Sequence, residues 1–335
     1  MKKIKKVLVT GAAGFIGSHM CDYLIKKNFF VYGLDNLKNG NKKNIIHLKK
    51  NRNFKFIKFD LLDKLNKNFF LNVDYVLHFA GIGDIVPSID YPKKYMLNNF
   101  NGTLNLLSNL NFKKVKKLVY AASSSCYGLA KTPTTEKNKI STLYPYALSK
   151  YFGEQICMHW HNVYGAKINS IRIFNAYGTR SRTTGAYGAV MGTFLKQVIS
   201  NNYLTVVGDG NQKRDFIFVT DVVRAFYKAM ITSKNGQIWN LGCGKPESIN
   251  QLIKYLKYNK KVHIPRRPNE PKITYADISK IKKDLNWKPV FDLKTGVGIM
   301  LNNLDYWKDA PLWTKKNIKK ATKNWFQYLG KNKKK

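Results

Sequence analysis

The stretch that decides the fold is Val7-Leu8-Val9-Thr10-Gly11-Ala12-Ala13-Gly14-Phe15-Ile16-Gly17. Its apolar start predicts a strand, its three glycines predict a tight turn, and the residues that follow have helical spacing. Glycines in such a turn let the backbone approach a pyrophosphate, whose charge is met by free N–H groups and by the positive end of the helix. The stretch therefore predicts a dinucleotide-binding turn; the alternative is a turn with only a structural role.

An acidic residue, Asp35, closes the second predicted strand, 18 residues after Gly17. A carboxylate at that place would accept hydrogen bonds from the ribose hydroxyls of an adenosine. It would also repel a 2′-phosphate, so the sequence favours NAD over NADP. Asp60, at the end of the third predicted strand, is a weaker candidate for a contact with the adenine.

Short apolar runs alternate with longer amphipathic stretches over the first half of the chain. The runs are 6–10, 29–34, 54–59, 75–80, 118–122 and 167–174, and the stretches of helical spacing include 16–27, 95–110 and 146–164. This alternation predicts an α/β fold, a Rossmann-type doubly wound parallel sheet with helices on both faces.

The pattern changes after residue 175, where glycine-marked turns and a proline-rich stretch from Pro265 to Pro271 indicate a smaller α+β C-terminal lobe. We therefore expect an NAD-binding domain at 1–175, which includes the stretch 146–164. A lobe at 176–305, with some segments returning to the first sheet, would bind mainly the substrate. A helical extension would occupy 306–335, and it is expected to dock because Ile318, Ala321, Trp325 and Leu329 share one helical face.

The net charge of +40 suggests, on its face, a nucleic-acid or anionic-membrane partner. Only eight of the positive charges are Arg, however, and the Lys residues are dispersed along the chain, which is more typical of a solvated surface than of a specific nucleic-acid site. A hydrophobic content of 44% excludes intrinsic disorder.

Cysteine usage and hydropathy indicate a reducing, cytoplasmic location. Cys21, Cys126, Cys157 and Cys243 form no CxxC pair, so neither a disulfide framework nor a metal site is predicted. No apolar run approaches the ~18 residues that a membrane span needs.

A second chemical signal is Tyr146-Ala147-Leu148-Ser149-Lys150, at the start of an amphipathic stretch. A spacing of four places the phenol and the ammonium on one helix face. A neighbouring cation favours phenolate and is expected to lower the phenol pKa from about 10, so Tyr146 could take a proton from a substrate hydroxyl. Upstream, a Ser-rich loop after Tyr120 could hold the same oxygen.

Each of these patterns alone has a plain alternative, a tyrosine that caps a helix and serines that form a turn. Their order in the chain, glycine turn, acidic strand end, Ser loop and YxxxK, is hard to explain as coincidence. With them in this order, the sequence resembles the extended short-chain dehydrogenase/reductases, in the branch of nucleotide-sugar epimerases and dehydratases. Further matching stretches are His78-Phe79-Ala80-Gly81, 99–103, 172–178, 208–216 and Arg267-Pro268-Asn269-Glu270.

The resemblance implies NAD as cofactor and a nucleotide-diphosphate sugar as substrate. It assigns catalytic roles to Ser123, Tyr146 and Lys150. It assigns the cofactor to Gly11, Gly14, Phe15, Ile16, Gly17, Asp35, Asn36, Asp60, Leu61, Ala80 and Asn99, together with Tyr146 and Lys150. It assigns the substrate to Ser88, Ser123, Asn175, Arg214, Arg267 and Glu270. The two arginines would grip the diphosphate, since Arg presents a fork to phosphate oxygens, and Glu270 would hold the nucleoside ribose.

The reaction is inferred from the two residues after Ser123. By resemblance, Tyr146 deprotonates the sugar 4-hydroxyl while C4 gives a hydride to NAD⁺. In 4,6-dehydratases an Asp-Glu pair follows the catalytic Ser or Thr, and decarboxylating relatives often have Glu at the second position; here both positions, Ser124 and Ser125, are serines. We therefore expect C4 epimerisation, of the UDP-GlcNAc/UDP-Glc type. The alternatives are a 4,6-dehydratase or UDP-glucuronate-processing enzyme, an NAD-binding scaffold, and an RNA-binding protein.

Departures from the family pattern leave the sugar and the nucleotide base open. Thr274 stands where glucose-restricted epimerases have a larger tyrosine, which would admit an N-acetylated sugar. Thr179 replaces a frequent proline, and Glu270 replaces a more usual Asp. In relatives, the helices corresponding to 95–110 and 146–164 commonly form a dimer seam, so a homodimer is expected.

Overall fold

The computed structural model describes residues 4–64, 72–181 and 190–330. Its main sheet has seven parallel strands in the order β11-β6-β5-β4-β1-β2-β3. The strands are β1 (Lys6–Thr10), β2 (Phe30–Asp35), β3 (Phe54–Lys58), β4 (Tyr75–His78), β5 (Lys117–Ser123), β6 (Ile168–Ile173) and β11 (Ile238–Leu241). The predicted α/β fold with a Rossmann-type sheet is confirmed, and the strand order reverses between β1 and β4, where such folds bind their ligands.

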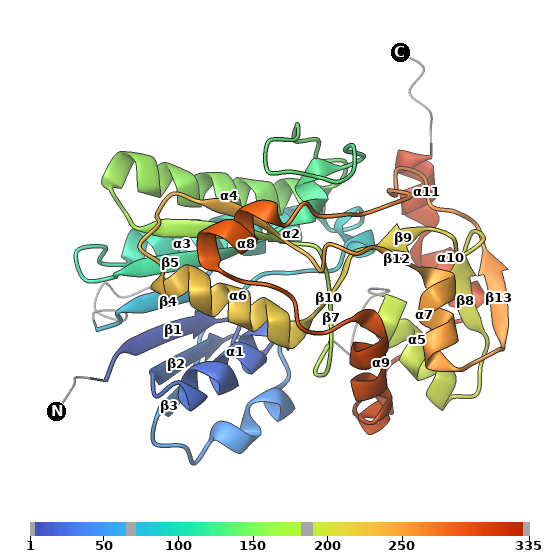
Figure 1. Ribbon diagram of the computed structural model, residues 1–335, viewed down its shortest axis with the longest axis horizontal. Coiled ribbons are helices and arrows are strands. Elements are labelled where there is room, and N and C mark those ends of the chain that lie inside the picture. The colour runs from blue at the N-terminus through green and yellow to red at the C-terminus, as the bar shows by residue number, and fades with distance from the viewer. Residues whose placement is uncertain (1–3, 65–71, 182–189, 331–335) are drawn as a thin grey trace.

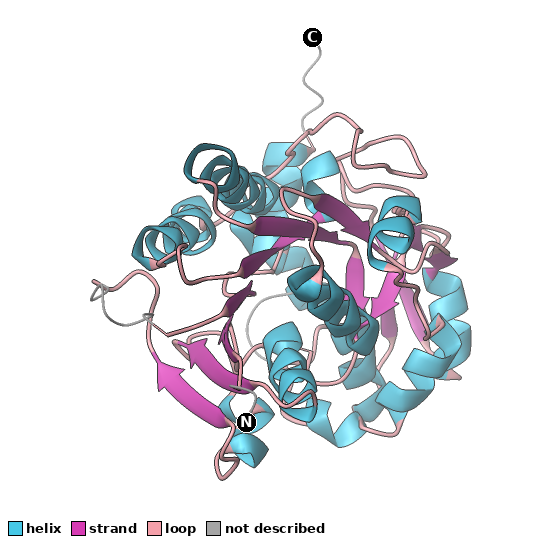
Figure 2. Cartoon of the chain, turned by 60° about the vertical axis from the view of Figure 1, so that its left-hand side comes forward, coloured by secondary structure: helices cyan, strands magenta, loops and turns pink. Residues whose placement is uncertain are grey.

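Helices cover both faces of this sheet (Figures 1 and 2). One face carries α1 (Phe15–Lys26) and α6 (Val219–Ile231), and the other carries α3 (Gly102–Asn109) and α4 (Pro145–Tyr164). Successive residues of β1 point to opposite faces, so Val7 and Val9 pack with α1 and α6 whereas Leu8 packs with α3 and α4. In the described parts of the chain, no helix combines the length and the apolar character that crossing a bilayer requires.

A smaller lobe with its own core lies beyond the carboxyl ends of the main strands (Figure 1). Its helices are α5 (Val190–Ile199), α7 (Ile249–Leu256) and α9 (Leu293–Leu301), and α8 (Ser279–Leu285) packs on β11. Three two-stranded sheets complete it: β8 (Leu204–Val207) with β13 (Lys261–Ile264), β7 (Asn175–Tyr177) with β10 (Phe216–Phe218), and β9 (Lys213–Arg214) with β12 (Glu247–Ser248). The smaller lobe therefore stands at the strand ends where a site is expected.

Two predicted helices are interrupted in the structure. The helix expected at 95–110 consists of α2 (Pro92–Met96), a π-helical turn (Leu97–Asn101) and α3. The C-terminal helix consists of α10 (Lys315–Ala321) and α11 (Lys323–Leu329), which join at Thr322, whose hydroxyl donates to the Ile318 carbonyl. Ile318 and Trp325 are both buried, so the expected apolar face is docked in spite of the interruption.

Candidate active site

Two glycines of the turn between β1 and α1, Gly11 and Gly17, are packed too closely to be replaced by a residue with a side chain. Gly11 has φ +69°, and a Cβ there would lie 2.8 Å from the Ala80 nitrogen. A Cβ on Gly17 would lie 2.1 Å from the Gly11 carbonyl oxygen. Gly14, which precedes α1, provides no side chain to cap the helix, so the first N–H groups of α1 remain available to an anion.

This turn opens onto a cavity of about 500 Å³ at the carboxyl ends of the strands. The predicted cofactor residues that line it are Gly11, Gly14, Phe15, Ile16, Gly17, Asp35, Asn36, Asp60, Leu61, Ala80, Tyr146 and Lys150. These side chains come from sequence positions up to 139 residues apart. The fold thus brings nearly the whole predicted cofactor set to one cleft.

Two carboxylates stand at the far end of this cleft. Asp35 accepts hydrogen bonds from the N–H groups of Ala13 (3.0 Å) and Leu37 (2.8 Å), and burial raises its pKa. Asp60 accepts from the Lys38 ammonium (2.8 Å) and the Asn36 amide (3.0 Å). Burial acts to raise the pKa of Asp60, but these hydrogen bonds outweigh it and hold that pKa below its usual value.

The three residues predicted to be catalytic lie where the cleft meets α4. Ser123 ends β5, Tyr146 lies in the first turn of α4 and is hydrogen-bonded to Ser123, and Lys150 follows one turn later. Pro145 begins the helix at a position where its missing N–H costs nothing. The Lys150 ammonium lies 4.4 Å from the centre of the Tyr120 ring, and burial lowers its pKa to about 8.

The predicted lowering of the Tyr146 pKa is wrong for this structure. Burial raises the pKa of Tyr146, and the hydrogen bond with Ser123 opposes that shift without cancelling it. Burial disfavours the charged form of every group, so it moves the phenol upward and the ammonium downward together. A spacing of four predicted both groups on one helix face, but the sequence did not show how deeply the two side chains are buried.

Asn99 and Ser88 are placed behind the walls of the site. The Asn99 amide accepts from the Ile82 N–H (2.7 Å) and donates to the Ile82 carbonyl (3.1 Å) and to the Ser149 hydroxyl (2.9 Å). The Ser88 hydroxyl donates to the Ile85 carbonyl (2.7 Å). Neither residue is among those that line the cavities, so the cofactor contact of Asn99 and the substrate contact of Ser88 stay predictions.

A second cavity, of about 330 Å³, adjoins the first and extends into the smaller lobe. The residues lining both cavities include Gly83 to Ile85, Ser124 and Ser125, and 174–177. The predicted substrate residues Asn175, Arg214, Arg267 and Glu270 all line the second cavity. Thr274 lines it too, and its hydroxyl donates to the Asn175 side-chain oxygen (2.7 Å), which fixes that amide.

Glu270 stands between the two arginines of this second cavity. It accepts from Arg214 Nη2 (2.9 Å) and from Arg267 Nε (2.8 Å) and Nη2 (3.0 Å). Burial acts to raise the pKa of Glu270, but the two guanidinium groups outweigh it and hold that pKa at about 2. The carboxylate therefore holds both guanidinium groups together in the wall of this cavity.

The comparison with protein families decides the identity. A model of the NAD dependent epimerase/dehydratase family matches residues 7–242. The chain belongs to this family. NAD is thus its cofactor, and the cleft fits this group: the glycine cradle leaves no room for a Cβ, α1 offers N–H groups, and Asp35 offers a carboxylate.

Proteins that are similar to this chain include nucleotide-sugar epimerases. A putative UDP-glucose 4-epimerase of Methanocaldococcus jannaschii is 36% identical over 88% of this chain and 97% of its own. A UDP-glucuronate 4-epimerase of Thermodesulfobacterium geofontis is 35% identical over 93% and 96%. The crystal structure of the UDP-glucuronic acid 4-epimerase from Bacillus cereus, in complex with UDP-glucuronic acid and NAD, superposes with a TM-score of 0.83 at 33% identity, over 90% of this chain and 99% of that one.

The contacts of His78 beside this cleft were not predicted from the sequence. His78 is buried beneath the glycine turn, between the hydroxyls of Thr10 (2.6 Å) and Thr103 (2.9 Å). Thr103 donates its proton to the Asn99 carbonyl, so it accepts from Nε2–H of His78, and Nδ1 accepts from Thr10. Burial, and next the charge of Lys150, lowers the His78 pKa to about 3. The motif around His78 was visible, but its partners were not.

A buried ion pair fixes the helix that carries Tyr146. Glu154 of α4 accepts from Nε (3.0 Å) and Nη2 (2.5 Å) of Arg172 in β6, and both side chains are almost fully buried. The Arg172 Nη1 also donates to the Tyr127 hydroxyl (2.7 Å), which donates to Asn240 of β11 (2.8 Å). These partners are distant in sequence and follow no spacing rule.

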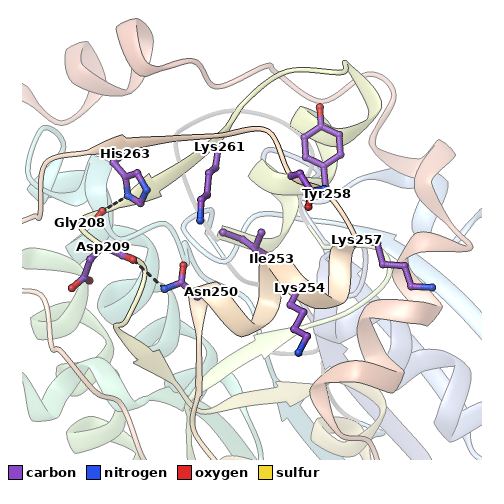
Figure 3. A pocket seen from close by; sticks show the side chains of 10 residues that line it. Gly208, Asp209, Asn250, Ile253, Lys254, Lys257, Tyr258, Lys261 and His263 are labelled. Atoms are coloured by element: carbon purple, nitrogen blue, oxygen red, sulfur yellow. Dashed lines mark hydrogen bonds between the residues drawn. The ribbon is translucent and has the colours of Figure 1, made fainter.

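A third, more open groove of about 730 Å³ lies on the outer side of the smaller lobe (Figure 3). Lys254, Lys257 and Lys261 line it, and the Nδ1–H of His263 donates to the Gly208 carbonyl (2.6 Å). None of its lining residues belongs to either of the two cavities above or to the sets predicted from the sequence. The residues predicted from the sequence thus lie at the two adjoining cavities and not at this groove.

Proposed function

We propose that this protein is an NAD-dependent 4-epimerase of a nucleotide-diphosphate sugar, of the UDP-GlcNAc/UDP-Glc type, which works through a transient 4-keto sugar. One observation carries the proposal: Ser123, Tyr146 and Lys150 line a cleft that adjoins a pocket containing two oriented arginines. The serines at 124 and 125 support epimerisation over reactions that need a further acid at those positions.

The side chains divide the work between them. Tyr146 takes the proton of the sugar 4-hydroxyl, Ser123 holds the same oxygen, and Lys150 supports the phenolate charge. NAD, when bound, would accept the hydride from C4 and give it back to the opposite face of the 4-keto carbon. Arg214 and Arg267 hold the diphosphate while the sugar turns in the pocket, and Tyr146 then returns the proton to the 4-oxygen of the epimer.

The 4,6-dehydratase alternative is favoured by one observation, the carboxylate of Asp84. Among the described residues, Asp84 is the acidic side chain that lines both cavities, and its charge raises the pKa of Tyr146. Dehydration needs an acid or base near C5 and C6 of the sugar, and in this alternative Asp84 would take that role. A uronate-processing enzyme would instead act on UDP-glucuronate, either with release of CO₂ or without it.

We also propose that the enzyme is a homodimer through the layer that contains α4. Phe152, Val163 and Tyr164 of α4 are exposed in the single chain, with Phe152 against Phe100 at 6.0 Å between ring centres. An exposed row of apolar side chains on a long helix suits a helix–helix interface.

The deciding experiment offers sugars to the purified protein. The released cofactor is identified first, and UDP-GlcNAc, UDP-Glc and UDP-glucuronate are then supplied in turn and the products resolved by NMR. We expect the 4-epimer of one neutral sugar and no loss of water or CO₂. A 4-keto-6-deoxy product would replace the proposal by the dehydratase, and binding of RNA without any sugar turnover would replace it by a non-enzymatic role.

The variant Tyr146→Phe tests the base. Its turnover should fall by about 10²-fold or more, since a positioned proton acceptor contributes that much, while the NAD content stays that of the wild type. Tyr203→Phe is the matched control, because its side chain is 57% exposed and lies in the smaller lobe, outside the proposed dimer seam. Substantial activity in Tyr146→Phe would remove this tyrosine as the base.

A further inference from the structure

We propose that the C-terminal helices form a clasp over the nucleotide end of the substrate pocket, and that Trp325 contributes to binding of the nucleoside. The clasp is defined as residues 315–329, which are α10, Thr322 and α11. This inference rests on the proposed function and adds to it a part of the chain to which neither the sequence motifs nor the family match, which ends at residue 242, assigns a role.

The clasp holds the loop that carries two predicted substrate residues. The indole N–H of Trp325 donates to the Pro268 carbonyl (3.0 Å), and the side-chain amide of Asn269 donates to the Leu329 carbonyl (2.9 Å). Pro268 and Asn269 stand between Arg267 and Glu270 in the chain. Two hydrogen bonds from α11 therefore fix the short segment on which the guanidinium and the carboxylate are mounted.

The clasp also contacts the larger lobe across the pocket. The Trp325 ring packs on Tyr144, with 5.2 Å between ring centres, and the Asn324 amide donates to the Asp90 carboxylate (2.6 Å). Tyr144 is hydrogen-bonded to Ser125 and precedes Pro145 and the proposed base. The clasp thus connects the loop at 267–270 to the wall of the site beside Ser125.

The position of Trp325 indicates which part of a ligand it touches. Trp325 is only 3% exposed, yet it is one of the residues that line the second cavity, together with Arg267, Asn269 and Glu270. Guanidinium groups suit phosphates, so the ligand's phosphates lie beside Arg214 and Arg267. A broad apolar ring next to them suits the flat face of a nucleoside, which aromatic side chains bind by stacking.

The apolar residues on which the clasp packs come from both lobes. Ile318 and Trp325 form one buried cluster with Val86 of the larger lobe and Ile264 of β13, and Val207 of β8 packs against it. Figure 1 shows α10 and α11 at the end of the molecule that carries β8 and β13. A change in how the clasp docks would therefore alter the affinity for a ligand that fills the pocket beside Trp325.

The experiment measures nucleotide affinity separately from chemistry. Full-length enzyme with its NAD is titrated with UDP by calorimetry, and KM and kcat are measured with the sugar that turns over. In Trp325→Ala we expect the Kd for UDP and the KM to rise about tenfold or more, with kcat within about twofold and unchanged NAD content. Trp325→Phe should recover most of the affinity because it keeps an aromatic face.

Two further variants separate the role of Trp325 from general stability. Asn269→Gly removes the bond to Leu329 and suits the backbone, whose φ is +57°, so we expect a severalfold rise in KM with kcat unchanged. Tyr328→Ala on the same helix, where the ring is 64% exposed, is the control and should match the wild type. Each variant's thermal unfolding midpoint shows whether it is folded.

The outcomes distinguish this inference from the proposed function. Wild-type affinity for UDP in folded Trp325→Ala, or in Asn269→Gly if the first variant does not fold, would overturn the clasp and leave the epimerase intact. A loss confined to kcat would also overturn it. A wild-type enzyme that neither binds UDP nor turns over a UDP-sugar would overturn the proposed function and the clasp together.

Discussion

Burial is the largest influence on the side chains around Tyr146. It raises the pKa of Tyr146, lowers that of Lys150 to about 8 and lowers that of His78 to about 3. His78, beneath the site, is thereby kept neutral between two threonine hydroxyls, whereas Lys150 stays protonated at neutral pH. A negative charge that develops on the Tyr146 oxygen during a reaction therefore interacts strongly with nearby charged and polar groups, because the buried surroundings screen it little.

The low pKa of His78 predicts how the stability of the protein depends on pH. Its pKa is about 3 in the folded chain and about 6.5 when unfolded, so between these values the unfolded chain binds more protons. The free energy of unfolding should therefore fall as the pH falls from about 6.5 toward 3, by at most ~1.4 kcal/mol per pH unit from this residue.

Urea unfolding of the wild type and of His78→Gln between pH 4.5 and 7 measures this contribution. The slope should be shallower in the variant. Some slope should remain, because burial also lowers the pKa of His19, to about 4. Equal slopes in the two proteins would show that His78 is not the group that titrates.

At the residue scale, the motifs identified many of the residues that line the cleft, but they did not indicate how deeply those residues are buried. Ser123, Tyr146 and Lys150 stand in motifs with fixed spacing, so the fold could be expected to bring them to one cleft. The pairing of Glu270 with both arginines joins residues 56 and 3 positions away, and no spacing rule indicates it. The pKa of Tyr146 depends on burial, which is a property of the packed chain.

At the scale of elements, we expect cofactor binding to depend on the glycine turn with α1. In Gly17→Ala the new methyl would lie 2.1 Å from the Gly11 carbonyl oxygen, so β1 and α1 would have to separate. We expect a destabilisation of about 1–3 kcal/mol and the loss of NAD from the purified protein. The measurements are the chemical-unfolding free energy and the cofactor released on denaturation.

Gly298→Ala is the matched control on another helix. Gly298 is an exposed residue of α9, and a Cβ there meets nothing within 4 Å. This substitution should stabilise the protein by about 0.5–1 kcal/mol and leave the NAD content unchanged. Retention of NAD by Gly17→Ala at the level of this control would contradict the role of the turn.

Helix and strand positions were largely predictable, and the helix interruptions were not. Strands buried between two helical layers have continuous apolar runs, which the sequence displays. The π-helical turn at Leu97–Asn101 holds Asn99, whose amide binds both backbone groups of Ile82, a contact with a distant loop that carries no local signal. The two-helix form of the C-terminus likewise depends on Thr322, which also has no clear breaker character.

The whole molecule combines a strongly basic surface with an exposed apolar row on α4. Two chains of charge +40 repel each other, so a dimer must gain enough from apolar contact to overcome that repulsion. We expect Phe152→Asp to shift the protein toward monomers, because it places a desolvated charge in the proposed seam. Added salt should strengthen wild-type association by screening the repulsion.

Analytical ultracentrifugation over a range of concentrations checks this expectation. Tyr203→Asp is the control, since Tyr203 is 57% exposed in the smaller lobe, outside the proposed seam. A wild type that sediments as a monomer throughout would refute the dimer, and an unchanged mass for Phe152→Asp would move the interface elsewhere.

The course of β11 and α6 has one more consequence. Both elements follow β8 in the chain, yet β11 is the outermost strand of the main sheet beside β6, and α6 covers that sheet's face. A fragment that stops near residue 175 would leave β6 as a bare edge and strip the apolar side chains that α6 shields. We therefore expect that neither the fragment before residue 175 nor the fragment after it folds alone. Cleavage of the backbone near residue 175 should destabilise both parts of the fold.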